Sequence, residues 1–66
     1  MTPERRDHLL RVVATVGSLD EMGGVRRQLA HQQELVGEVY TAMQRRVDEL
    51  AARERISPTH WWRRRA

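Results

Sequence analysis

The sequence has no cysteine, no phenylalanine and no long apolar run. Without cysteine, neither a disulfide framework nor a thiolate zinc site can stabilise the chain. A chain of 66 residues buries only about 60% of its unfolded surface, which leaves self-association as the expected source of extra stability. The longest apolar stretch, residues 12–16, is interrupted by Thr15 and is far shorter than the roughly 18 residues of a membrane span. We therefore expect a cytoplasmic protein that makes no membrane contact, with one domain over residues 1–66.

Lysine is also absent, so all twelve basic side chains are arginines. This pattern is compatible with a GC-rich coding sequence and does not by itself indicate a function. The distribution of charge is more informative, because residues 1–17 carry a net charge of +1, residues 18–44 of −2 and residues 45–66 of +4. A basic end beside a nearly neutral body favours attraction to phosphate or to an acidic protein surface.

Helix signals cover most of the chain. Thr2 before Pro3 is a capping hydroxyl followed by the residue best tolerated at the first helical position. Apolar residues then recur at helical spacing as far as Gly17, which predicts a first helix over residues 3–16. The pair Ser18 and Glu21 next matches a capping box, in which each side chain satisfies a free backbone donor of the other.

The longest predicted element is a continuous helix over residues 25–55, interrupted in pattern only by Gly37. At 1.5 Å per residue this helix is about 45 Å long, whereas the first helix is about 20 Å long. A hairpin of the two therefore covers about half of the apolar stripe on the longer helix. We expect the uncovered part to form the interface of a symmetric homodimer, with Val36, Val39, Tyr40, Met43, Val47 and Leu50 as its residues.

Residues 56–66 form a basic C-terminal segment rich in tryptophan and arginine. Pro58 ends the long helix, because proline disfavours helical geometry at the residue before it, and a short helix over residues 59–65 is expected to follow. The predicted fold is thus all-α, a helical hairpin with a short C-terminal helix, assembled as a dimeric helical bundle.

Residues 50–65 resemble the helix-turn-helix of transcription regulators. In that family a leucine-alanine pair packs the first helix, an apolar residue and a serine form the turn, and a later apolar side chain locks the recognition helix. The residues here that correspond are Leu50, Ala51, Ile56, Ser57 and Trp61. Arg55 stands where the family usually has a left-handed glycine, and Arg64 replaces a usually apolar residue. The resemblance implies that the major groove of DNA is contacted by Thr59, His60, Trp62 and Arg63, and that phosphates are contacted by the neighbouring Arg64 and Arg65.

We predict no enzyme activity, metal site or cofactor, because His8, His31 and His60 have no metal-ligand spacing and no third residue is in evidence to orient His60 toward Ser57. The leading hypothesis is a small dimeric DNA-binding regulator. One alternative is a docking module, adaptor or antitoxin-like, whose apolar stripe binds another helical protein. RNA is a second alternative, since tryptophan and arginine can stack on unpaired bases.

Overall fold

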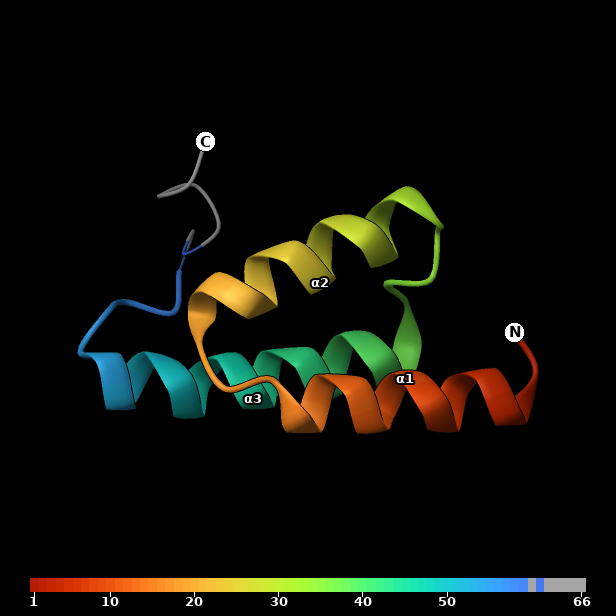
Figure 1. The fold of residues 1–66 in the computed structure, drawn as a ribbon, viewed down its shortest axis with the longest axis horizontal. Coiled ribbons are helices and arrows are strands. Elements are labelled where there is room, and N and C mark those ends of the chain that lie inside the picture. Colours follow the sequence, from red (N-terminus) through yellow and green to blue (C-terminus); the bar gives the residue numbers. More distant parts are fainter. Residues whose placement is uncertain (60, 62–66) are drawn as a thin grey trace.

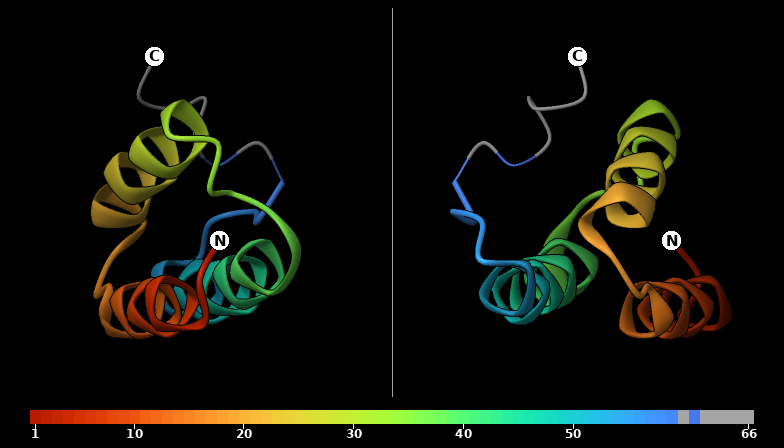
Figure 2. Two further views of the ribbon diagram at one scale, coloured as in Figure 1. Left: turned by 90° about the vertical axis from the view of Figure 1, so that its right-hand side faces the viewer. Right: turned by 60° about the vertical axis from the view of Figure 1, so that its left-hand side comes forward.

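The computed structural model describes residues 1–59 and residue 61. Its secondary structure in this part is helical, with α1 at Pro3–Thr15, α2 at Leu19–His31 and α3 at Gly37–Glu54. Helices α1 and α3 lie side by side and run in the same direction, and α2 runs back above them (Figure 1). Viewed toward their ends, the three helices form a triangle (Figure 2). The all-α class is therefore confirmed, and within the described residues no helix is long and apolar enough to cross a membrane.

Helix α1 begins as its sequence predicts. The Thr2 hydroxyl accepts a hydrogen bond from the Arg5 amide at 3.2 Å, and Pro3 is the first helical residue. The helix ends at Thr15, one residue before the predicted end, because Val16 is extended with φ −62° and ψ 130°. The local signals therefore placed both ends of α1 to within one residue.

Helix α2 begins at the predicted cap. The Ser18 hydroxyl accepts a hydrogen bond from the Glu21 amide at 3.2 Å, which satisfies one of the free donors of the first turn. Gly23 and Gly24, which weaken a helix in isolation, lie inside α2 without interrupting it. Tertiary packing thus overrides the low helix propensity of this pair.

The prediction of one helix over residues 25–55 is wrong, because the chain reverses at residues 32–36. The Gln33 amide donates to the Ala30 carbonyl at 3.1 Å and the Glu34 amide donates to the Leu29 carbonyl at 2.8 Å, which is the Schellman arrangement of a helix end. Gln33 lies in the left-handed region at φ 58°, a position where a residue with a Cβ atom is strained by about 1 kcal/mol or more. Gly37, at φ 50°, opens α3 after the reversal.

The reversal completes the core of the bundle. It turns α3 back beneath α2 and alongside α1, so that apolar side chains from all three helices meet inside one chain. Met22 of α2 and Met43 of α3 are among the largest fully buried side chains. Among the described residues, the buried apolar side chains are those of Leu9, Val13, Val16, Leu19, Met22, Leu29, Val39, Met43, Val47, Leu50, Ala51 and Trp61.

We expect Gln33→Gly to raise the free energy of unfolding by about 0.5 to 1 kcal/mol, because glycine removes the Cβ strain of the left-handed position. The matched control is Gln32→Gly at the preceding residue, whose φ of −85° is ordinary for any side chain. There glycine should lower stability by about 0.5 kcal/mol or more, since it adds freedom to the unfolded chain and removes the hydrogen bond that Gln32 Oε1 accepts from Arg5. Urea unfolding of both variants measures the difference. Equal effects of the two substitutions would contradict the left-handed assignment at Gln33.

Candidate functional site

Helix α3 ends in a left-handed turn at Arg55. Arg55 lies in the left-handed region, with φ 57° and ψ 43°. The Ile56 amide donates to the Ala51 carbonyl at 2.9 Å, and the Arg55 amide donates to the Ala52 carbonyl at 3.4 Å. Leu50 and Ala51, the pair expected to pack the first helix of the motif, are both buried. The chain therefore leaves α3 through a hydrogen-bonded turn rather than by fraying.

The first part of the C-terminal segment packs on the bundle. Ile56 is half-buried against the core, and the Ser57 hydroxyl accepts a hydrogen bond from the Thr59 amide at 3.3 Å. Trp61 is 3% exposed and belongs to the core cluster. Thr59, the first of the predicted DNA-contacting residues, is exposed. The other five, together with most of the short helix predicted over residues 59–65, lie outside the described residues: His60, Trp62, Arg63, Arg64 and Arg65.

Two side chains of α3 hold the connection between α1 and α2. The Glu54 carboxylate accepts a hydrogen bond from the Leu19 amide at 2.8 Å and so caps the first turn of α2. The Arg46 guanidinium donates to the Val16 carbonyl at 2.9 Å. Because a carboxylate is favoured at the positive end of a helix, the Glu54 contact ties the start of α2 to the turn from which the C-terminal segment departs.

An ion pair holds the opposite end of the bundle. Two nitrogens of Arg5 donate to the two carboxylate oxygens of Glu34, both at 2.7 Å, and Arg5 Nη2 also donates to Gln32 Oε1 at 3.3 Å. The hydrogen bonds from Arg5 lower the pKa of Glu34 below its ordinary value, against a smaller opposing effect of desolvation. The same hydrogen bonds raise the pKa of Arg5. This pair links α1 to the reversal between α2 and α3.

The predicted dimer residues occupy two different environments. Four of them are buried within the core of the single chain, namely Val39, Met43, Val47 and Leu50. Val36 and Tyr40 remain exposed, at 55% and 45%. The premise that half of the stripe lacks cover is therefore wrong, because α2 folds back over it, and a dimer would have to use other contacts.

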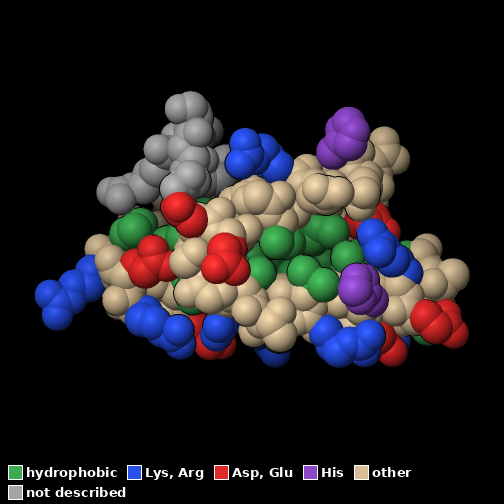
Figure 3. All heavy atoms as spheres, viewed as in Figure 1, with side chains coloured by type: hydrophobic (Ala, Val, Ile, Leu, Met, Phe, Trp, Pro, Cys, Tyr) green, Lys and Arg blue, Asp and Glu red, His purple; other side chains and the backbone are tan. Residues whose placement is uncertain are grey.

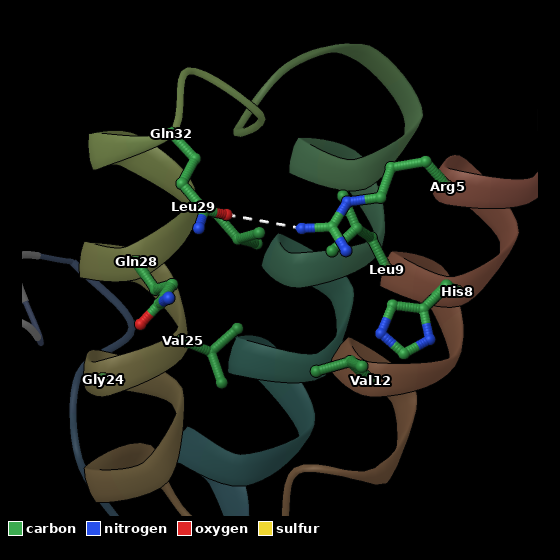
Figure 4. Close-up of a pocket in the computed structure, with 9 residues that line it drawn as sticks. All are labelled: Arg5, His8, Leu9, Val12, Gly24, Val25, Gln28, Leu29 and Gln32. Carbon is green, nitrogen blue, oxygen red and sulfur yellow. Dashed lines mark hydrogen bonds between the residues drawn. The ribbon is translucent and has the colours of Figure 1, made fainter. Parts of the chain in front are cut away.

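A groove that the sequence did not reveal lies between α1 and α2. It encloses about 310 Å³, and apolar side chains line its floor while polar ones stand at its edges (Figure 4). The space-filling view shows apolar surface gathered between the two helices (Figure 3). The lining residues are Arg5, His8, Leu9, Val12, Gly24, Val25, Gln28, Leu29 and Gln32. Within residues 1–59 and 61, no cluster of three or more potential metal-ligating side chains occurs.

Comparison with known proteins adds no relative: no family model, no curated protein and no solved structure matches this chain. The candidate sites are therefore defined by the residues and geometry of this chain alone.

The Arg5–Glu34 pair makes a pH dependence of stability testable. Because the pKa of Glu34 is lowered in the folded state, its contribution is fully present above the unfolded value of about 4.5 and is lost as the pH falls through the folded pKa. We expect Glu34→Gln to lower the thermal midpoint at neutral pH and to make its acid decline shallower. The control is Asp48→Asn on the exposed side of α3. Identical pH profiles for Glu34→Gln and wild type would show that the pair does not stabilise the fold.

Proposed function

We propose that this protein is a small DNA-binding regulator that contacts DNA through residues 56–66. The observation that carries the proposal is the turn at Arg55 followed by the buried Trp61. A left-handed turn and a buried apolar anchor are the two local features by which a helix-turn-helix fixes its reading segment. A segment attached to the bundle by a buried residue loses less conformational entropy on binding DNA than a free arginine tail does. This difference supports a role of the segment in DNA recognition.

The charge distribution supports the same function. Residues 1–62 contain nine arginines and nine acidic residues, so the net charge of +3 equals the three arginines at positions 63–65. A balanced body with a positive end directs attraction for phosphate to one place on the molecule. RNA is also a polyanion, so we treat a preference for RNA as an outcome of the binding experiment rather than as a separate proposal.

We also propose that the regulator is a homodimer, with Val36 and Tyr40 in its interface. Both residues are large, apolar and exposed, and they lie four residues apart at the start of α3. A two-fold dimer would present two basic segments to one duplex, as paired half-sites require.

Salt dependence tests the DNA proposal. Replacing Arg63, Arg64 and Arg65 by alanine should flatten the log-log slope of affinity against salt by up to about 2.7 per chain, since each neutralised phosphate contributes about 0.9. The matched control replaces Arg11, Arg27 and Arg45, three exposed arginines of the helices, and changes the net charge equally. Mobility shift of genomic DNA fragments across a salt series measures both slopes. Equal flattening by the two triple variants, or no binding of wild type at about 50 mM salt, would contradict the proposal.

Sedimentation tests the dimer proposal. Wild type at micromolar concentration should sediment above 7.8 kDa, the mass of one chain, and Tyr40→Glu should shift it to monomer while its helical circular dichroism stays unchanged. Thr41→Glu, at an exposed neighbouring residue of α3, is the matched control and should leave the dimer intact. A wild-type protein that sediments as a single chain would exclude this assembly.

A further inference from the structure

We infer that the groove between α1 and α2 binds an amphipathic helix of another protein, one that carries an acidic side chain beside its aliphatic residues. The groove arises because α1 and α2 diverge above α3 (Figure 2). A helix laid between them would complete a bundle of four helices, which is the helix-in-groove mode of recognition. No residue of the turn at Arg55 lines this groove, so binding of a helix there would be an activity in addition to the proposed DNA binding.

The floor of the groove fits aliphatic side chains. Leu9 and Leu29 are buried beneath it, whereas Val12 and Val25 are half-buried and so remain accessible from above. Leu9 and Val12 lie three residues apart on α1, and Val25 and Leu29 lie four apart on α2, so the floor is about one helical turn long. A volume of about 310 Å³ accommodates one or two large aliphatic side chains from successive turns of a partner helix.

The edges of the groove favour a carboxylate. Its polar lining consists of Arg5 and His8 on α1 and Gln28 and Gln32 on α2, with no acidic residue among them (Figure 4). The hydrogen bonds of Arg5 to Glu34 and Gln32 use Nε and Nη2, which leaves Nη1 outside these bonds on a side chain that is 42% exposed. A guanidinium held at Nε and Nη2 by Glu34 and Gln32 is oriented in advance to donate from Nη1 to a second carboxylate.

The same features argue against this chain as the occupant. Among the described residues, the large apolar side chains that a second copy exposes are Met1, Val36 and Tyr40. The proposed dimer uses Val36 and Tyr40, which leaves Met1 alone to enter the groove. The three arginines at positions 63–65 carry the same charge as Arg5, so this sequence is not the acidic one that the edge of the groove favours. A partner with free aliphatic residues and a negative charge has neither disadvantage.

Gly24 provides a variant that blocks the groove without disturbing the fold. It lines the groove from α2, and a Cβ atom placed on it would meet no atom within 4 Å. Gly24→Gln therefore fills space and improves helix propensity at once, so its thermal midpoint should equal or exceed that of wild type. The matched control is Ala30→Gln, which adds a glutamine at an exposed residue of α2 that does not line the groove.

The probe is a fluorescent peptide of about 16 residues, which is long enough to populate a helix. It consists of alanine, leucine and glutamate, and its leucines are spaced alternately three and four residues apart so that they form one face of the helix. We expect it to shift the methyl resonances of Val12 and Val25 and to bind Gly24→Gln at least about tenfold more weakly than wild type or Ala30→Gln. The same peptide with lysine in place of glutamate should bind more weakly than the acidic one.

Three results would overturn the inference. One is the absence of any shift at Val12 and Val25 with the acidic peptide at millimolar concentration, and another is equal affinity for Gly24→Gln and Ala30→Gln. The third is a loss of self-association in Gly24→Gln, which would identify a second copy of this chain as the occupant. None of these measurements involves DNA, so they leave the proposed function to its own test.

Discussion

The fold depends on a chain reversal at residues 32–36. The left-handed position of this reversal is occupied by Gln33 and not by a glycine, so its strain is not relieved. The strain at Gln33 is of the order of 1 kcal/mol, and two kinds of contact offset it. One is the burial of α2 against α1 and α3, and the other is the bidentate pair of Glu34, the next residue, with Arg5. A straight helix would forgo both and leave the apolar stripe of α3 in water. The three-helix bundle is therefore favoured by contacts made far from the turn itself.

Polar contacts between distant residues hold both ends of the bundle. At one end Glu54 and Arg46 of α3 satisfy backbone groups of the connection between α1 and α2. At the other end Arg5 of α1 holds the connection between α2 and α3. Such contacts stabilise less than apolar burial does, but they fix the register of the helices and satisfy backbone groups at the helix ends. They also explain why α1 and α2 can diverge without losing their places on α3.

The two candidate sites follow from these two ends. Glu54 lies beside the turn at Arg55, so the point from which the basic segment departs is tied to α2 as well as to α3. Arg5 closes one end of the groove by its contact with Gln32 across α1 and α2 (Figure 4). The groove is thus lined by α1 and α2, whereas the turn at Arg55 ends α3, and DNA binding is proposed only for the segment that follows this turn.

The sequence by itself determined the helical class and the beginnings of α1 and α2, because the caps at Thr2 and Ser18 are local contacts between residues three apart. Tertiary structure decided the reversal at Gln33, since the pair of Arg5 and Glu34 spans 29 residues and periodicity alone continues the helix. The same reversal decided that Met43 and its neighbours are buried within one chain. Local hydrogen bonds can be predicted from a sequence, whereas a strained turn is adopted only because the packing of the whole chain stabilises it.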